Sequence, residues 1–198
     1  VMPQIGLDFP NILRHIVRQD PDIIMIGEIR DLETAEIAIQ SSLTGHLVFS
    51  TLHTNDAPTA ITRLLDIGVP NFLLAATIRG ILAQRLVRVI CPYCREMDNE
   101  AIKDERTKEI FRGEKVTLYR GRGCEKCAYT GFLGRSGIYE LLTIDASIHN
   151  LIIKNADVQQ IHAAARKNGM RTLMEDGLLK VKDGVTTINE ILRATQEL

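Results

Sequence analysis

Two patterns of apolar and polar residues follow one another along the first 90 residues. Short apolar runs predict strands, and longer segments with helical periodicity predict helices. The mostly apolar runs Ile23–Ile26 and Leu47–Ser50 are short, and each is followed by polar residues. Such runs are typical of strands in a parallel α/β sheet, so we expect Ile23–Ile26 to be buried on both faces. A third short run predicts a strand at Leu86–Ile90. Helical patterns occupy Phe9–Gln19, Leu32–Leu43, Ala57–Asp66 and Asn71–Gln84.

The pattern changes after this part of the chain. Residues 95–122 are polar and charged and lack apolar periodicity, and a strand is expected after them at Gly137–Leu142. We therefore divide the chain into residues 1–90, 91–135 and 136–198. Four short helices are expected near the end, at Ser147–Asn155, Val158–Asn168, Arg171–Val181 and Ile188–Thr195.

Particular residues mark where the helices begin and end. Asp31 suits the N-terminal cap of the helix that begins at Leu32, and Gly45 suits its C-terminal end. Gly68 is expected to stop the helix that begins at Ala57. Capping boxes are predicted at two later helix starts, formed by Asp157 with Gln160 and by Thr187 with Glu190.

Composition limits the classes of protein to consider. Of the 198 residues 45% are apolar, which is enough for a hydrophobic core, and the net charge of -1 does not suit a chain that binds polyanions as a whole. Aromatic residues make up 5% and Trp is absent, which argues against a surface that stacks on bases. No apolar run approaches the roughly 20 residues of a membrane span, and no signal peptide is visible. We expect a cytoplasmic fragment of a longer protein.

The four cysteines form two C-x-x-C pairs, which is the spacing of a four-cysteine zinc site. The alternatives are two disulfides or four unligated thiols, and disulfides require an oxidising compartment. Because four protein ligands close the coordination sphere, the expected role of the zinc is structural. The expected metal ligands are Cys91, Cys94, Cys124 and Cys127.

One function that the cysteines allow is that of a zinc ribbon that binds nucleic acid or protein and is not itself an enzyme. It accounts for the cysteines and for basic residues near them, but it gives no role to the polar residues at the strand ends. Most such basic residues are simply solvated. The basic residues are Arg112, Lys115, Arg120, Arg122, Lys126 and Arg135.

Polar side chains follow the first two predicted strands. Glu28 ends the first strand, and Ser50, Thr51 and His53 end the second. A carboxylate beside hydroxyls and an imidazole suits a phosphate, a metal ion and a water molecule. His46 follows Gly45 directly, so it has a structural interpretation as a residue that bonds the helix end. The order of strand, Gly-Glu, helix, strand and His matches the second half of a P-loop ATPase core.

Several longer segments resemble motifs of the secretion ATPases, which drive type II secretion and type IV pilus assembly. Gln19–Asp31 resembles their Walker B segment, and Thr44–Asn55 is similar to their His box. Ala83–Leu86, Gly134–Glu140 and the two cysteine pairs also match. The resemblance covers essentially the whole chain. It implies the C-terminal part of a RecA-like P-loop ATPase core, with an inserted zinc-binding hairpin and a C-terminal helical subdomain.

The resemblance implies roles for four residues at the strand ends. Glu28 would order the magnesium ion and its water shell, or help to polarise the attacking water. His53 would sense the γ-phosphate, His46 would support the His box, and Thr51 would be a partner behind them.

The resemblance also implies the setting of the intact protein. It would be a cytoplasmic motor ATPase that uses ATP and Mg²⁺, forms a homohexamer and moves a platform protein of the inner membrane, with which it associates peripherally. No nucleic acid is expected as a partner. Pilus-retraction members typically lack the cysteine pairs, so the assembly or secretion branch is favoured.

One motif of the family is missing. The sequence contains no G-x-x-x-x-G-K-[ST], so the Walker A loop that cradles phosphates is absent, and so is the acidic segment that follows it in the family. We therefore expect this chain to be inactive alone.

Overall fold

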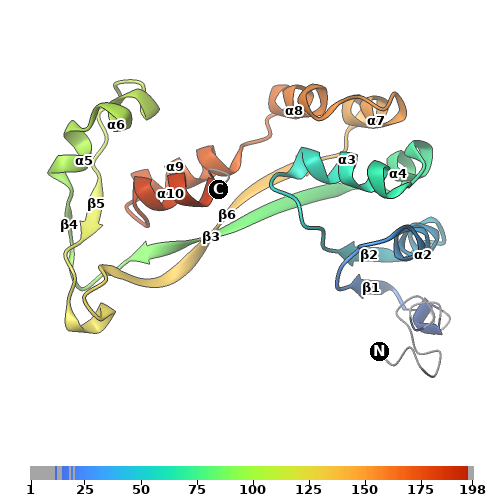
Figure 1. Cartoon of the computed structure of the whole chain (residues 1–198), viewed down its shortest axis with the longest axis horizontal. Helices are drawn as coiled ribbons and strands as arrows, with labels where there is room; N and C mark the ends of the chain where they lie inside the picture. The colour runs from blue at the N-terminus through green and yellow to red at the C-terminus, as the bar shows by residue number, and fades with distance from the viewer. Residues whose placement is uncertain (1–11, 13–14, 18, 20, 196–198) are drawn as a thin grey trace. The chain divides into compact units, whose positions relative to one another are not determined.

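The computed structural model describes residue 12, residues 15–17, residue 19 and residues 21–195. The chain forms two compact units, one of residues 1–81 and 142–170 and the other of residues 82–141 and 171–198 (Figure 1). The predicted helix at Phe9–Gln19 falls largely outside the described residues, although residues 12 and 15–17 within it are helical. None of the helices in the described part of the chain is long and apolar enough to cross a membrane.

The first unit begins with a parallel β-α-β element whose bounds match the sequence prediction. It consists of β1 (Ile23–Ile26), α2 (Leu32–Leu43) and β2 (Leu47–Ser50), with Ile23 paired to Leu47 and Ile26 to Ser50. The carboxylate of Asp31 accepts a hydrogen bond from the Thr34 amide at 2.8 Å, which fixes the start of α2. Gly45 follows the helix with φ 102°, a conformation that favours glycine.

The prediction that β1 is buried on both faces is wrong. Ile24 and Ile26 are buried with Ala38 of α2, whereas Ile23 and Met25 are 60% and 65% exposed. Side chains point alternately to the two faces of a strand. Among the described residues, α2 covers only one of these faces. The register places Leu47 and Phe49 of β2 beside the exposed pair, since Leu47 pairs with Ile23 and Phe49 with Met25. The four side chains form an exposed apolar face.

Four helices complete the first unit. α3 (Ala57–Ile67) packs against α8 (Val158–Lys167), and α4 (Asn71–Thr77) packs against α7 (Ala146–Ile153). Gly68 ends α3 with φ 106°, as predicted.

The predicted helix at Asn71–Gln84 is wrong in its second half. α4 ends at Thr77, and β3 (Gly80–Ile90) begins three residues later and absorbs the predicted strand Leu86–Ile90. Helix propensity is low around Thr77–Gly80, because threonine and isoleucine are β-branched and glycine is flexible. Along β3 the exposure alternates, with Ala83 and Val87 buried. This alternation is the period of a strand and not of a helix.

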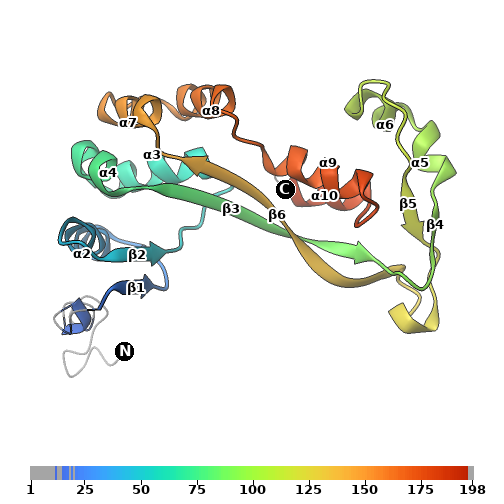
Figure 2. The same ribbon diagram turned by 180° about the vertical axis from the view of Figure 1, so that it is seen from behind.

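The second unit is built on β3 and β6 (Phe132–Thr143), which pair as a two-stranded sheet. Figure 2 shows the two strands running in opposite directions. β6 extends the predicted strand Gly137–Leu142 at both ends. On β6, Ile138, Glu140 and Leu142 are buried.

The polar segment forms a hairpin with two short helices at its end. The hairpin strands are β4 (Arg95–Met97) and β5 (Tyr119–Gly121), which pair in antiparallel register. The helices are α5 (Asn99–Lys103) and α6 (Glu105–Ile110). Phe111 and Leu118 are buried, which gives this hairpin a small apolar core.

The chain ends with α9 (Leu173–Lys182) and α10 (Ile188–Thr195), which pack against each other in the second unit. A Cβ atom at Gly177 would lie 2.7 Å from side-chain atoms of Ile191, so only glycine allows this approach. α10 is also held to β3, because a guanidinium nitrogen of Arg88 lies 2.6 Å from Oε1 of Glu190.

The predicted capping boxes are only half formed. Asp157 accepts from the Gln160 amide at 2.8 Å, and Thr187 Oγ1 accepts from the Glu190 amide at 3.4 Å. The Glu190 carboxylate cannot complete its box because it binds Arg88. A complete capping box, which the sequence analysis missed, lies at the start of α9 and is formed by Thr172 and Glu175.

Candidate functional site

The ends of β1 and β2 bring three of the predicted residues together. Past the strands, Thr51 Oγ1 donates to the Gly27 carbonyl at 2.6 Å, and the Ile29 amide donates to the Thr51 carbonyl at 3.1 Å. These two bonds fix the backbone on both sides of Glu28. As a result, Nε2 of His53 lies 2.8 Å from Oε1 of Glu28. Thr51 therefore supports the pair through the backbone.

The carboxylate of Glu28 has a second partner, the cation of Arg30, that the sequence analysis did not identify. Nε of Arg30 donates to Oε2 of Glu28 at 2.6 Å, and Nη2 of the same side chain lies 2.5 Å from that oxygen. The pKa of Glu28 is lowered chiefly by the hydrogen bond from Arg30. Desolvation opposes this effect, and the electrostatic interactions of Glu28 with Arg30 and His53 add to it. The only signal in the sequence is that residues two apart on an extended segment point to the same side.

His46 lies apart from this group and bonds the end of α2. Its amide donates to the Ser41 carbonyl at 3.1 Å, and its Nδ1 lies 2.9 Å from the same oxygen and 3.0 Å from Thr44 Oγ1. A bond to a carbonyl requires that Nδ1 carries the proton, so the neutral ring presents Nε2 as an acceptor. The geometry matches the structural interpretation of His46.

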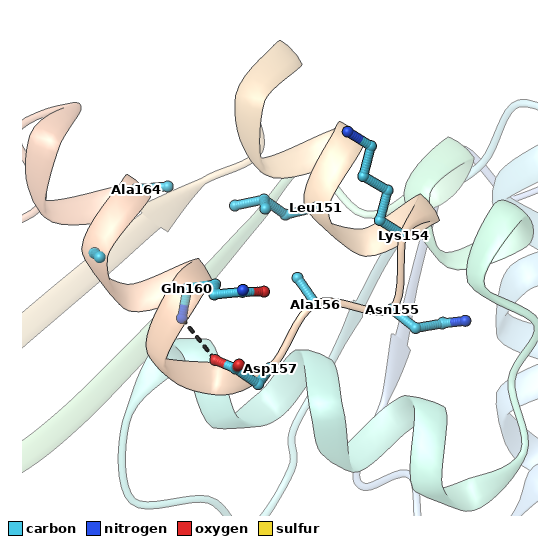
Figure 3. A pocket seen from close by; sticks show the side chains of 8 residues that line it. Leu151, Lys154, Asn155, Ala156, Asp157, Gln160 and Ala164 are labelled. Carbon is cyan, nitrogen blue, oxygen red and sulfur yellow. Dashed lines mark hydrogen bonds between the residues drawn. The ribbon is translucent and has the colours of Figure 1, made fainter.

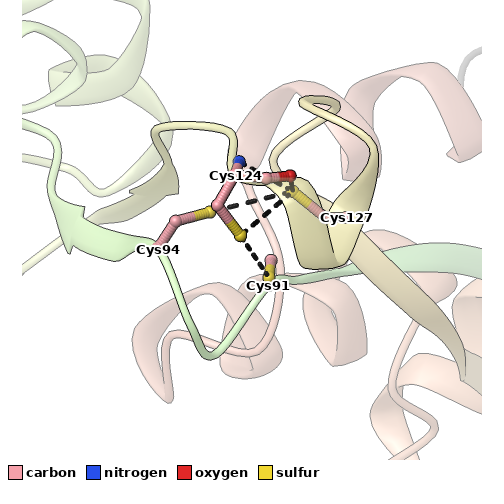
Figure 4. Close-up of side chains that lie close together, drawn as sticks. All are labelled: Cys91, Cys94, Cys124 and Cys127. Atoms are coloured by element: carbon pink, nitrogen blue, oxygen red, sulfur yellow. Dashed lines mark hydrogen bonds between the residues drawn. The ribbon is translucent and has the colours of Figure 1, made fainter.

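The four cysteine sulfurs cluster at the base of the hairpin (Figure 4). All four lie within 4.8 Å of one another, and three of the sulfur pairs are separated by 3.9, 3.9 and 3.8 Å. Zn–S bonds of about 2.3 Å in a tetrahedron place the sulfurs about 3.8 Å apart. All four cysteines are free, and a disulfide would need sulfurs about 2.0 Å apart. The cluster is therefore compatible with a tetrahedral metal ion.

Close backbone contacts shape this cluster. A Cβ atom at Gly121 would lie 1.9 Å from the carbonyl oxygen of Gly131, so the two segments can approach only through glycine. The amides of Cys124 and Gly131 donate to the sulfur of Cys127 at 3.2 and 3.3 Å. Although desolvation opposes the effect, these amides and the neighbouring thiols lower the pKa of Cys127 to about 6. The thiolate that a metal requires is thus favoured at Cys127.

A separate open hollow of about 700 Å³ lies along α7 and α8 (Figure 3). Its lining includes Leu151, Lys154 and Gln160, together with Asp157, which caps α8. None of the residues predicted to act on nucleotide or metal lines it. We therefore place the candidate chemistry at the ends of β1 and β2 and at the cysteines.

Comparison with known proteins identifies the family of the chain. A family described as "Type II/IV secretion system protein" matches residues 1–193. The type II secretion system ATPase E of Vibrio cholerae is 48% identical over 200 residues, which cover 100% of this chain and 39% of the relative. The type IV pilus assembly ATPase PilB of Thermus thermophilus is 49% identical over 201 residues, covering 100% of this chain and 22% of the relative.

Solved structures show the same fold. The pilus retraction motor PilT with bound ADP has a TM-score of 0.67 and 29% identity, and the match covers 96% of this chain and 44% of PilT. The ATPase DotB of Legionella pneumophila, at 22% identity and a TM-score of 0.63, supports the fold alone. The chain thus spans less than half the length of these relatives.

Proposed function

The chain belongs to the family of type II/IV secretion system proteins, and on that premise we propose that it is part of a motor ATPase. The longer protein would hydrolyse ATP to power pseudopilus or pilus assembly in a type II secretion or type IV pilus system. The observation that carries this proposal is the contact between Glu28 and His53 at the carboxyl ends of β1 and β2, 2.8 Å between the nearest atoms. Ligands of α/β sheets bind at this edge.

Glu28 is the residue to which we assign the central chemical role. Its side chain is 20% exposed, so it reaches solvent while its backbone is fixed by Thr51. With its pKa below the ordinary value of 4.5, the carboxylate is ionised at neutral pH. It can then hold the water shell of Mg²⁺ or accept a hydrogen bond from the attacking water.

His53 is the residue that we propose to sense the γ-phosphate. Its side chain is 86% exposed and is held in place by Glu28 on one side. When both ring nitrogens carry a proton, Nε2 can donate to Glu28 while Nδ1 donates to a phosphate oxygen, so the ring links the carboxylate to the phosphate. His46 supports the segment from the end of α2, where it bonds Ser41.

Mg²⁺ and ATP fit the donors that this chain supplies. A half-buried carboxylate next to a strand end is a site that a hydrated magnesium ion accepts, because Mg²⁺ binds few protein oxygens and keeps its waters. Magnesium would neutralise charge on the phosphates during transfer. The sequence holds no G-x-x-x-x-G-K-[ST], so the amides that cradle the phosphates must come from elsewhere in the longer protein.

The proposed core is RecA-like, with residues 1–90 as its Walker B and His-box part. The exposed apolar face formed by Ile23, Met25, Leu47 and Phe49 supports this proposal, since parallel sheets are normally covered on both faces. Residues 91–135 would be the zinc-binding part, and residues 136–198 the return strand and helical subdomain.

We assign a structural zinc ion to the cysteine cluster. The donors would be the sulfurs of Cys91, Cys94, Cys124 and Cys127, whose separations suit a tetrahedron. The ion would pin the base of a hairpin whose own apolar core is small. A zinc ribbon that binds nucleic acid leaves the contact between Glu28 and His53 without a role, so we do not favour it.

The proposed setting follows the relatives. The longer protein would form a homohexamer in the cytoplasm and reach the inner membrane through a platform protein. Relatives in both systems match equally well, since the type II secretion and type IV pilus proteins are 48% and 49% identical. Either system is therefore consistent with the chain.

The test is the substitution Glu28→Gln in the longer protein. The change keeps the shape and removes the charge, so phosphate release should fall by at least about 100-fold, while nucleotide binding remains. Glu36→Gln is the control, because Glu36 is exposed on α2. Hydrolysis at the unmodified rate in the Glu28 variant would make Glu28 a structural residue.

A further inference from the structure

Each oxygen of the Glu28 carboxylate has a basic side chain as its partner. Arg30 contacts Oε2 through two nitrogens, at 2.6 Å from Nε and 2.5 Å from Nη2, and His53 lies 2.8 Å from Oε1. The guanidinium cancels the negative charge that would attract a hydrated magnesium ion. It also stands where a water molecule would approach Oε2. The carboxylate is therefore held in an arrangement that does not favour its proposed chemical role.

The Arg30 side chain is free to leave without any movement of the backbone. The side chain is 77% exposed. The backbone before it is fixed by the bond from the Ile29 amide to Thr51, and the residue after it, Asp31, caps α2 through the Thr34 amide. Rotation about the side-chain bonds of Arg30 is thus sufficient to release Glu28.

A nucleotide offers Arg30 a stronger partner than Glu28 does. An ion pair with so exposed a cation contributes little, because solvent screens the attraction between the two charges. Phosphates carry more charge and suit the planar guanidinium, which binds two of their oxygens at once. The pair is therefore weak enough to be broken by a ligand that binds at the same sheet edge.

We propose that Arg30 is a positioning residue that exchanges partners, a role that rests on the proposed function. In the nucleotide-free protein it holds Glu28, and in the loaded protein it binds a phosphate of the nucleotide. The exchange frees Glu28 to orient the hydrated metal ion or the attacking water only when a nucleotide is present. Glu28 and the nucleotide therefore compete for one guanidinium.

Competition predicts a specific pattern of nucleotide affinities in the longer protein. The variants are Glu28→Gln, Arg30→Gln and the double variant, and the measurement is the dissociation constant of a fluorescent ATP analogue with Mg²⁺. Glu28→Gln should tighten binding by about fivefold or more, the lower end of common coupling between sites. In the Arg30→Gln background the same change should have little effect. Equal tightening in both backgrounds would reduce the effect to general charge repulsion and overturn the exchange.

Steady-state kinetics separate this role from a purely structural one. Arg30→Gln should raise KM for ATP by a larger factor than it lowers kcat, because a phosphate contact is lost. Arg30→Lys keeps the charge but has one donor nitrogen in place of the fork, so it should restore part of the KM. A lower kcat with unchanged KM and affinity would show that Arg30 only orients Glu28.

A matched control and the unmodified protein complete the test. Arg106 is exposed on α6, in the other unit, and Arg106→Gln should change neither KM nor affinity. If the unmodified longer protein releases no phosphate, the proposed function fails. If it releases phosphate and Glu28→Gln stops the release, but the two substitutions act independently on affinity, only the exchange fails.

Discussion

Nε2 of His53 lies 2.8 Å from Oε1 of Glu28, although 25 positions separate the two residues in the chain. The contact depends on the parallel pairing of β1 and β2 and on the bond from Thr51 to the Gly27 carbonyl, which extends the register beyond the strands. An acid at the end of one strand and an imidazole beyond the next thus form one site. Each residue alone has a common structural explanation, and their contact is what favours a shared chemical role.

His53→Ala should lower ATP turnover in the longer protein more than it lowers nucleotide affinity. The ring is 86% exposed, so its loss removes a contact to ligand and carboxylate but little packing. The measurements are kcat for phosphate release and the dissociation constant of an ATP analogue. His149→Ala, at an exposed position on α7, is the control. Equal losses in turnover and affinity would point to a role in folding.

The 198-residue chain alone should not turn over ATP. Positioning and electrostatic stabilisation of the phosphates supply nearly all catalysis in phosphoryl transfer, and the sequence lacks the loop that cradles them. Phosphate release by the purified chain at millimolar Mg-ATP is the measurement. Steady release that Glu28→Gln abolishes would mean that this chain holds a complete site.

The buried carboxylate of Glu190, in the first turn of α10, predicts that the free energy of unfolding depends on pH. The side chain of Glu190 is 4% exposed, and its pKa is lowered chiefly by the hydrogen bond from Arg88. A lowered pKa contributes stability above the ordinary value of 4.5, and this contribution is lost as the pH falls through the folded-state pKa. Arg88→Gln should therefore destabilise the chain by about 1.5–3 kcal/mol at pH 7 and by less at pH 3.5.

Urea unfolding of the purified chain at both pH values measures this difference. Arg193→Gln is the matched control, because Arg193 also contacts Glu190 but is 63% exposed, so its loss should cost less. A cost of Arg88→Gln that is the same at pH 7 and pH 3.5 would show that lost packing on the Phe132 ring, 4.2 Å from the guanidinium, dominates.

Metal removal should affect the hairpin and leave the rest folded. Cys124→Ser removes one of four sulfurs that lie within 4.8 Å of one another, so the chain should lose the one zinc ion proposed for this cluster. Residues 95–122 should become sensitive to protease, while helical signal largely remains, because Val87 and Ile138 stay buried in the β3–β6 pair. Elemental analysis and limited proteolysis are the measurements. A metal-free wild-type protein with free thiols and a resistant hairpin would contradict the zinc assignment.

The part of the fold that the sequence predicts best is fixed by local signals. β1, α2 and β2 match residue for residue, because short apolar runs, the Asp31 cap and Gly45 all act within a few positions. The helix predicted at Asn71–Gln84 fails because its apolar residues suit either period. Pairing of β3 with β6, a contact across more than 40 positions, decides that Ile81 and Leu82 lie on a strand.

The site also has a part that the sequence predicts and a part that depends on the folded structure. Glu28, Thr51 and His53 could be chosen from the sequence because parallel strands deliver their ends to one edge. The partner role of Arg30 could not, because it depends on the rotamer of an exposed side chain. The glycines that shape the cysteine cluster were also missed, since the approach of Gly121 to Gly131 follows from backbone positions set by the whole hairpin.

The most direct test of the central claim is a double-mutant cycle on kcat in the longer protein, with Glu28→Gln, His53→Ala and both. Residues that act as one unit show strongly non-additive losses. The account predicts that adding His53→Ala to Glu28→Gln lowers kcat little further, although each change alone lowers it clearly. Independent losses that multiply in the double variant would contradict the claim that Glu28 and His53 form one catalytic pair.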